Sequence, residues 1–446
     1  MNIKPIAFAL AFSAFVAPLF ANEGKQYSID EIIELAVSQD YGIRQLNSNA
    51  LSLKETGVAS STLMDPKIKF GVGGLPVDSF QFDESAMTNI SIGLGQQFSR
   101  GSTLELTQQR YEQQSQISQQ QLQLRKLNIA KSITRLWIEL QYLVRANDLT
   151  VEMRELMSDM TTFIQTNYSL GRNEAQDLLF AELQVSKLDE NLQKNQQMQQ
   201  RIRAQLSEWV DQRIIDDIVV GKPMSLFWSR LNQLQDQLPL YTTDYYELFI
   251  QHPKILALDK NISAKETQVL IAEEAYSPQF GIEVGYAYRQ ANEMNGQPAS
   301  DLVSAYLTMD IPLFTDKRQD RKYAAAQYQV GAAKSQKGLL LRQMNAKVNT
   351  LFTDKSNLEE RLERYKTVLL KQANDRTKAT ERGYENNTVQ FSDLIMAVRD
   401  ELMIAVEEAK LQSDLDKTMN ELAYTLNQYD QNVTELSAAR TTQENH

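Results

Sequence analysis

The chain has 446 residues, enough for two or three domains of average size, and its 46 basic and 57 acidic residues give a formal net charge of −11. This acidic balance disfavours a nucleic-acid partner, which requires a basic face. The sequence has no cysteine and two histidines, His252 and His446, which excludes disulfides, thiolate chemistry and a histidine-rich metal site. Glycine and proline are scarce, which favours long helices.

The first 21 residues have the pattern of a secretory signal peptide. Lys4 provides the positive charge, residues 6–20 form a short apolar stretch, and Leu19-Phe20-Ala21 provides a cleavage site. We therefore expect an exported mature chain that begins at Asn22. No later stretch reaches the ~18 consecutive apolar residues that a transmembrane helix requires.

Each half of the chain is predicted to open with a helix. Ser28-Ile29-Asp30-Glu31 is a capping box, in which the serine side chain and the glutamate side chain each bond the other residue's backbone N–H. The helical pattern pauses at Asp40-Tyr41-Gly42, and His252-Pro253 marks the same pause in the second half. Pro66 and Pro278 then end these helices, because the residue before proline avoids the helical conformation.

After each proline the hydrophobic period changes from 3.6 to 2. This alternation predicts two strand pairs, within 66–99 and 278–313, with about ten residues per strand, long enough to cross a bilayer when tilted. Pro76-Val77-Asp78 and Asn295-Gly296 supply the turns. Glu283 is expected to face a lumen, whereas five residues of the same strand are expected to face lipid: Phe280, Ile282, Val284, Tyr286 and Tyr288.

Very long helices follow the strands, at 103–168 and 318–383, each about 100 Å long at 1.5 Å per residue. Their apolar residues keep the 3-4 spacing of a coiled coil, with Lys355 as the polar exception. Gly171 and Asn387 are predicted to end these helices in tip turns, before return helices from about 174 and 389. The spaced residues are Leu149, Met153, Leu156, Met160 and Phe163, then Leu341, Met344, Val348, Leu351, Leu358, Leu362, Tyr365 and Leu369.

The chain also repeats itself. Five residues around the first tip turn recur around the second at one common spacing and in the same order. We predict two structural repeats, 22–222 and 240–430, joined by a linker at 223–239 and followed by a polar tail at 431–446. The recurring residues are Tyr168, Gly171, Asp177, Leu178 and Ala181 in the first repeat and Tyr384, Asn387, Asp393, Leu394 and Ala397 in the second.

Two of these features have alternative interpretations. The strands are either an ordinary antiparallel sheet packed on helices or part of a membrane barrel, and a barrel of four strands cannot close without further copies of the chain. Asp177 and Asp393 either compensate helix dipoles or form a carboxylate ring at a channel tip, and the sequence alone favours the dipole interpretation.

The order helix, two strands, long helix, turn, helix, present twice, resembles the outer membrane factor family, the TolC-like efflux channels, over nearly the whole mature chain. The pattern Tyr168-x-x-Gly171…Asp177-Leu178-Leu179 looks like the helix-turn motif of that family. The first strand pair, from Asp65-Pro66 through Gly74-Leu75-Pro76 to Met87-Thr88, is similar to its heavy-metal (Cus/Czc-type) branch.

The resemblance implies a mainly α fold with a small β part, in which three chains build a 12-stranded outer-membrane β-barrel and a coiled-coil α-helical periplasmic tunnel. It implies a homotrimer in the outer membrane of a Gram-negative cell, docked to a periplasmic adaptor (membrane fusion) protein and an inner-membrane RND pump. Asp393 would line the periplasmic iris; Met396 and Val389 stand where relatives often carry a second aspartate and an arginine.

The cargo that the resemblance favours is heavy-metal cations, and organic drugs or a type I secretion partner are alternatives within the same architecture. A soluble periplasmic coiled-coil adaptor or scaffold is an alternative of another class. A secreted enzyme would need a polar constellation, and the sequence shows no glycine-rich phosphate loop, nucleophile elbow or His/carboxylate cluster. We therefore expect no catalytic residues, no cofactor, no resident metal and no nucleic-acid partner.

Overall fold

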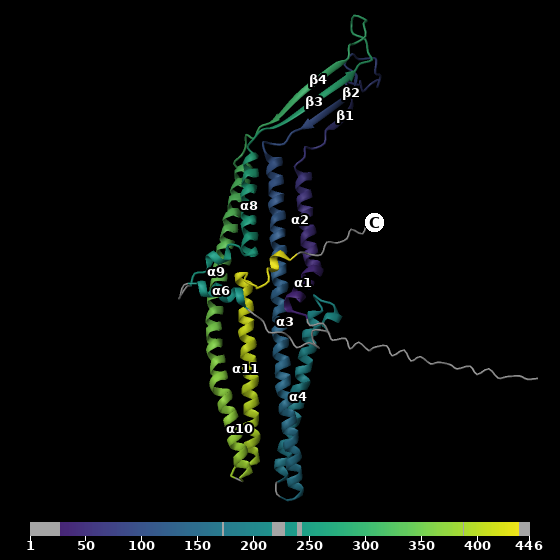
Figure 1. Cartoon of the computed structure of the whole chain (residues 1–446). Coiled ribbons are helices and arrows are strands. Elements are labelled where there is room, and N and C mark those ends of the chain that lie inside the picture. Colours follow the sequence, from purple (N-terminus) through teal and green to yellow (C-terminus); the bar gives the residue numbers. More distant parts are fainter. Residues whose placement is uncertain (1–26, 172–173, 216–227, 239–242, 387, 437–446) are drawn as a thin grey trace, which may run out of the picture.

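The computed structural model describes residues 27–171, 174–215, 228–238, 243–386 and 388–436. The predicted signal peptide and Asn387 lie outside these residues. A four-stranded sheet lies at one end of the molecule, and the long helices extend away from it (Figure 1). The helices are α1 (Ile29–Gln39), α2 (Tyr41–Ser60), α3 (Thr103–Ser169), α4 (Ala175–Leu206), α6 (Ser229–Gln237), α7 (Tyr246–Phe249), α8 (Pro253–Glu274), α9 (Gln319–Arg364), α10 (Leu370–Glu385) and α11 (Phe391–Leu426), and the strands are β1 (Lys67–Gly73), β2 (Asn89–Gln97), β3 (Gln279–Tyr288) and β4 (Leu302–Asp310).

The predicted capping box starts α1. The backbone N–H of Ser28 donates to the Glu31 carboxylate at 2.9 Å, and the N–H of Glu31 donates to the serine hydroxyl at 3.2 Å. The pause after α1 is also present, because the Asp40 side chain accepts the N–H of Ile43 at 2.7 Å and begins α2. The same carboxylate pairs with Arg125 of α3 at 2.8 Å, which fixes the helix break against the longest helix.

The two strand pairs form at the predicted positions and join into one antiparallel sheet in the order β1-β2-β3-β4. Two boundaries differ from the prediction. β1 has seven residues rather than about ten, and β4 ends at Asp310 rather than near residue 313. Pro312 explains the second difference, because proline has no N–H to continue the ladder.

The first long helix is continuous, since α3 spans 67 residues. The second is one rod in which a π-helical turn (Tyr365–Leu369) separates α9 from α10. The prediction of one regular helix over 318–383 is therefore corrected at this turn. The wider i→i+5 hydrogen-bonded turn accommodates one extra residue. The residue types of the turn are those of an ordinary helix, so the hydrophobic spacing did not reveal it.

The heptad register predicted for the first long helix is partly wrong. Leu156 and Phe163 are exposed by 45 % and 54 %, whereas Met157 and Ile164 are buried. α3 packs against both α4 and α11, and the facing cluster selects the positions next to the predicted ones. In α9 the prediction is confirmed at three positions, since Met344, Val348 and Leu362 are buried. Lys355 is buried as well and pairs with Glu359 at 2.6 Å.

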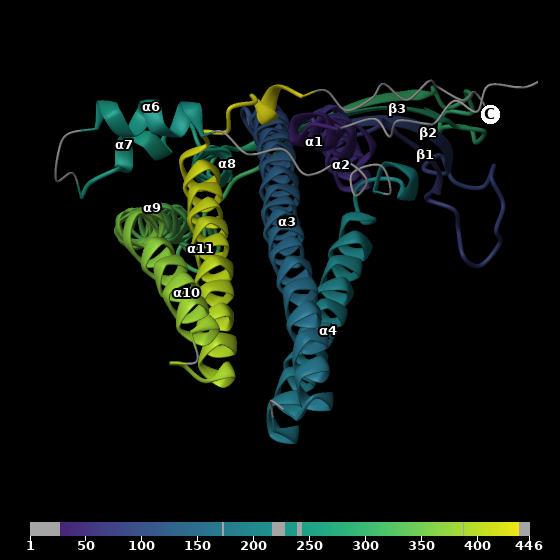
Figure 2. The ribbon, with the colours of Figure 1, turned by 60° about the horizontal axis from the view of Figure 1, so that its bottom comes forward.

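The main core lies midway along the molecule, where α1, α3, α4, α9 and α11 meet the short helices α6 and α7 (Figures 1 and 2). A second, smaller cluster lies toward the hairpin ends and joins α3, α4 and α11. Its buried members are Met153, Met157, Ile164, Ala181, Leu188, Phe391, Leu394, Ile395 and Val398. The two helical hairpins are thereby held together along their length rather than at the core alone.

His252 lies within the main core and begins α8. Its Nδ1 accepts the N–H of Lys254 at 3.2 Å, so in the neutral ring Nε2 carries the hydrogen and donates to the Tyr424 carbonyl at 3.3 Å. Burial lowers the pKa of this imidazole to about 4, which the bond to the Tyr424 carbonyl only partly opposes. His252 therefore caps a helix as a neutral group.

The segments predicted as linker and tail contain ordered parts. Within 223–239, α6 packs on α11: the Trp228 indole donates to Asp416 at 3.1 Å. Within the tail, a 3-10 turn (Val433–Glu435) buries Val433, and Lys126 of α3 donates to the carbonyls of Thr434 and Leu436 at 3.0 and 2.5 Å. The tail thus begins as a part of the helical core.

Candidate functional site

The two faces of the sheet differ in chemistry. One face carries an unbroken row of apolar side chains, because antiparallel partners lie directly opposite one another: Phe70 pairs with Ile92, Ile92 with Tyr286, and Tyr286 with Val303. These four side chains are between 45 and 78 % exposed. The whole apolar face consists of Ile68, Phe70, Val72, Ile90, Ile92, Leu94, Phe280, Ile282, Val284, Tyr286, Tyr288, Val303, Leu307 and Met309, all exposed.

The opposite face is mainly glycine and polar side chains, with Leu302 and Tyr306 as its larger nonpolar or aromatic members. Lys69 of β1 and Glu283 of β3 form an ion pair across this face. The pair passes over β2 at Gly93 and Gly95, whose lack of side chains leaves room for the carboxylate. A polar face of small residues next to an exposed apolar face is the arrangement of a sheet that separates water from a nonpolar environment.

Both edges of the sheet are open within the chain. β1 pairs only with β2, and β4 only with β3, among the residues that the structure describes. Unpaired edge strands present free N–H and C=O groups, which a nonpolar environment does not tolerate. The sheet is therefore a fragment that further strands have to complete if its apolar face meets lipid.

The opposite end of the molecule carries the two helical hairpin tips (Figure 1). Gly171 follows α3 with a positive φ of 70°, as predicted for a tip turn. Asp177 and Asp393 occupy the first turns of α4 and α11, where a negative charge is favourable. Asp393 is exposed and Asp177 is half-buried, so these two residues, predicted to correspond in the two repeats, differ in access to solvent.

Ion pairs join the two helices of each hairpin, several helical turns from its tip. Arg154 of α3 pairs with Asp189 of α4 at 3.0 Å, and Arg376 of α10 pairs with Asp400 of α11 at 2.8 Å. The hydrogen bond from Arg376 lowers the pKa of the Asp400 carboxyl, and Arg399 acts in the same direction. These pairs lie across the hairpins at unrelated sequence spacings, so no local pattern could have revealed them.

The predicted site residues are thus divided between two ends of the molecule. The five residues of β3 lie together on the apolar face, and Glu283 lies on the other face. Gly171, Asp177 and Asp393 lie at the hairpin ends, about 100 Å from the sheet for a helix of this length. Asn387 is outside the described residues.

Two features are absent from the residues that the structure describes. None of their helices is long and apolar enough to span a membrane. No group of three or more His, Asp or Glu side chains among them is arranged to hold a metal ion.

Comparison with known proteins shows the fold. No family model and no curated protein matches the sequence. The structure is similar to the Campylobacter jejuni CmeC outer membrane channel (10 % identity, 98 % of both chains, TM-score 0.71) and to the outer membrane protein VceC of Vibrio cholerae (15 % identity, 89 % of this chain and 95 % of that one, TM-score 0.68). It is also similar to CusC, whose structures describe transmembrane channel formation (12 % identity, 96 % of this chain and 98 % of that one, TM-score 0.71).

Proposed function

We propose that this protein is one subunit of the outer-membrane exit channel of a tripartite efflux pump, a passive conduit from the periplasm to the outside. The observation that carries the proposal is the exposed apolar face of an open four-stranded sheet at the end of a long helical stack. Contact between such a face and lipid costs no free energy, whereas exposing the same apolar surface to water is unfavourable. The structural similarity to outer membrane channels supports the same role.

The open edges support a homotrimer. Four strands from each of three chains make twelve, and joining β1 of one chain to β4 of the next closes the sheet into a barrel with no free edge. The apolar face then turns outward to lipid and the Lys69–Glu283 face turns toward a water-filled lumen. In this assembly Phe280, Ile282, Val284, Tyr286 and Tyr288 are lipid-facing.

The helical part supports the remaining partners. Three pairs of hairpins would form a periplasmic tunnel whose tips face away from the outer membrane. At that end we place a periplasmic adaptor protein and an inner-membrane RND pump, as the family resemblance implies. The repeated element order, which places helices and one strand pair before each hairpin, is consistent with an internal duplication of residues 22–222 and 240–430.

The oligomeric state tests this function directly. The full chain is expressed with its predicted signal peptide, and the mature protein is extracted from the outer-membrane fraction in mild detergent. It is expected to be a trimer by light scattering and to form channels in planar bilayers. A monodisperse monomer that still inserts into liposomes would contradict the trimer. Recovery in the soluble periplasmic fraction would favour the coiled-coil scaffold instead.

The cargo class is the finer part of the proposal. The similarity of residues 65–88 to the heavy-metal branch makes metal cations the first cargo to test, and organic compounds the second. A strain that lacks the gene is expected to become sensitive to copper, silver, cobalt, zinc or cadmium salts and to regain resistance when the gene is restored. Unchanged metal resistance together with new sensitivity to organic compounds would remove the heavy-metal assignment.

We further propose that Asp393 forms the periplasmic iris. It is exposed in the first turn of α11, at the hairpin end, and three copies would converge on the trimer axis. A ring of carboxylates concentrates cations, so hexamminecobalt added on the periplasmic side should block conductance. Asp393→Asn should weaken the block, while Asp177→Asn should change it less. Equal block of wild type and Asp393→Asn would place the ring elsewhere.

A further inference from the structure

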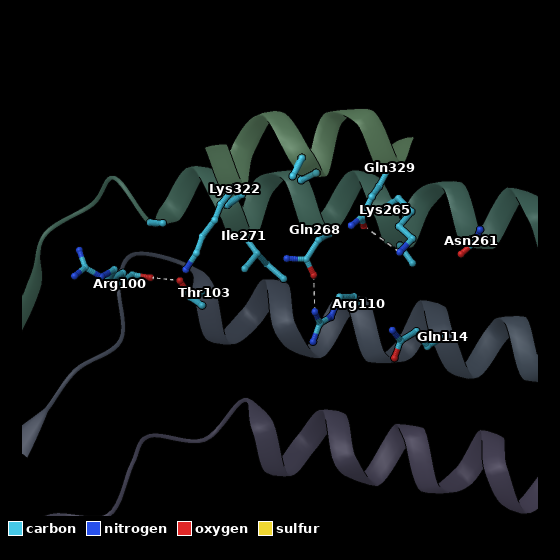
Figure 3. A pocket seen from close by; sticks show the side chains of 15 residues that line it. Arg100, Thr103, Arg110, Gln114, Asn261, Lys265, Gln268, Ile271, Lys322 and Gln329 are labelled. Atoms are coloured by element: carbon cyan, nitrogen blue, oxygen red, sulfur yellow. Dashed lines mark hydrogen bonds between the residues drawn. The ribbon is translucent and has the colours of Figure 1, made fainter. Parts of the chain in front are cut away.

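A pocket of about 640 Å³ lies where the sheet meets the helices, between α3, α8 and α9 (Figure 3). Four basic side chains line it: Arg100 precedes α3, Arg110 belongs to α3, Lys265 to α8 and Lys322 to α9. No acidic residue lines it. This basic junction pocket, defined by these four side chains, stands out in a chain whose net charge is −11.

Three of the four cations lack a carboxylate partner among the described residues. Arg110 donates to the Gln268 amide at 2.5 Å, and Lys265 donates to the Gln329 amide at 3.2 Å. The side-chain ammonium of Lys322 has no hydrogen-bond partner in the part of the chain that the structure describes, and Figure 3 shows this side chain extending from α9 toward the α3 side of the pocket. The Nε of Arg110 is buried with no acceptor.

The acidic groups at this junction bond to other residues. Arg100, the fourth cation, pairs with Asp310 of β4. Glu274 accepts the Ser277 hydroxyl at 3.1 Å, and Asp320 accepts the Tyr276 hydroxyl at 2.7 Å. Among the described residues, no carboxylate forms an ion pair with Arg110, Lys265 or Lys322, and none lines the pocket beside them. A buried donor without an acceptor and a set of unpaired cations both favour an anion.

The remaining lining has the composition of an organic-ligand site. Gln114 and Asn261 supply further amide groups, while Ile271 and several alanines supply apolar contact. The volume lies in the range of pockets for drug-sized ligands, and these commonly combine a largely apolar lining with a few polar anchors. A hydrated metal cation gains nothing from such a lining, since three unpaired positive charges repel it.

The position of the pocket relates it to the path of the cargo. Arg100 bonds to Asp310, which lies on the same face of the sheet as the Lys69–Glu283 pair. In the proposed trimer this face lines the lumen, so the pocket opens at the junction of barrel and tunnel. Resting on the proposed function, we propose that the basic junction pocket binds an organic anion of drug size, and that such anions belong to the cargo of the channel.

The binding step is tested on the purified full-length trimer in detergent with two dyes of similar size, the anionic carboxyfluorescein and the cationic rhodamine 6G. Fluorescence anisotropy is expected to show saturable binding of carboxyfluorescein that weakens with added salt, and none of rhodamine 6G. The double variant Arg110→Gln/Lys322→Gln should lose at least tenfold in affinity. Lys334→Gln is the matched control, because Lys334 is also on α9 but pairs with Glu266 outside the pocket.

Three outcomes would overturn the proposal: no saturable carboxyfluorescein binding, equal binding of both dyes, or binding unchanged in the double variant. An arm with inorganic phosphate separates a small-anion site from an organic one, since displacement of the dye by millimolar phosphate contradicts a drug-sized ligand. Planar-bilayer recordings of the same preparations keep the two proposals apart. Channels that open normally without binding the dye refute the pocket alone, whereas protein that forms no channel refutes the proposed function.

Discussion

The sheet exposes its apolar side chains, whereas the helical core buries them. Ile92 of β2 is 47 % exposed and Ile133 of α3 is fully buried, although the residue type is the same. In the helices the chain supplies its own apolar surroundings, because helices from both halves meet at one core. In the sheet the apolar face is left uncovered by the residues that the structure describes. The difference indicates that the two regions are built for different solvents.

The largest expected loss of stability is at Ile133, the buried residue of the two. Ile133→Ala should lower the free energy of unfolding by about 2–5 kcal/mol, because it leaves a cavity among close-packed helices. Ile92→Ala, its matched control on the sheet, should cost about 1 kcal/mol or less, since lipid or detergent fills the space. Guanidinium denaturation of the detergent-solubilised protein measures both. Equal costs would mean that the sheet face is packed rather than solvated by lipid.

The second effect tests the two faces of one strand. Val284→Arg should destabilise folding into vesicles by about 2–4 kcal/mol if the residue lies near the middle of the bilayer. Glu283→Gln, one residue away on the polar face, should cost less than about 1 kcal/mol, since it removes an exposed ion pair with Lys69. Urea titration of vesicle-folded protein compares the two variants. Similar damage from both would contradict the assignment of faces.

The third effect tests whether the helical core around His252 excludes water. His252 has a pKa lowered to about 4 from 6.5, so between these values the unfolded chain binds the proton and the folded chain does not. Stability is therefore complete above about pH 6.5 and falls as the pH drops toward 4, by on the order of 2–3 kcal/mol. Denaturation at pH 7.5 and 4.5 should show this loss in wild type and a smaller one in His252→Gln. An identical pH dependence of stability in wild type and His252→Gln would show that water reaches the imidazole ring.

The smallest effect concerns the hairpin end, where an exposed ion pair joins α10 and α11. Arg376 and Asp400 have side chains 57 % and 37 % exposed, so their ion pair should contribute less than about 1 kcal/mol in a double-mutant cycle. Because the pKa of Asp400 is lowered in the folded chain, this contribution is present above about pH 4 and is lost as the pH falls further. A coupling of several kcal/mol would make the pair a latch of the tip instead of a surface contact.

The sequence by itself determined the local elements and their order. The capping box of α1, the alternation of β3 and the glycine at the first tip each depend on neighbours within a few residues, and each is present in the structure. The helices predicted to stop at Pro66 and Pro278 end earlier, at Ser60 and Glu274. The face shared by the five apolar residues of β3 follows from the period of a strand in the same way.

Only the tertiary structure decided which elements meet. The pairing of β2 with β3 joins strands from different halves, and the register of α3 depends on α4 and α11 together, which is why Leu156 was misassigned. The π turn after Arg364 changes the backbone without a change in residue types. The basic junction pocket draws its four cations from β2–α3, α3, α8 and α9. Contacts between residues more than a hundred positions apart have no periodic signal, because they are selected by packing of the whole chain rather than by local geometry.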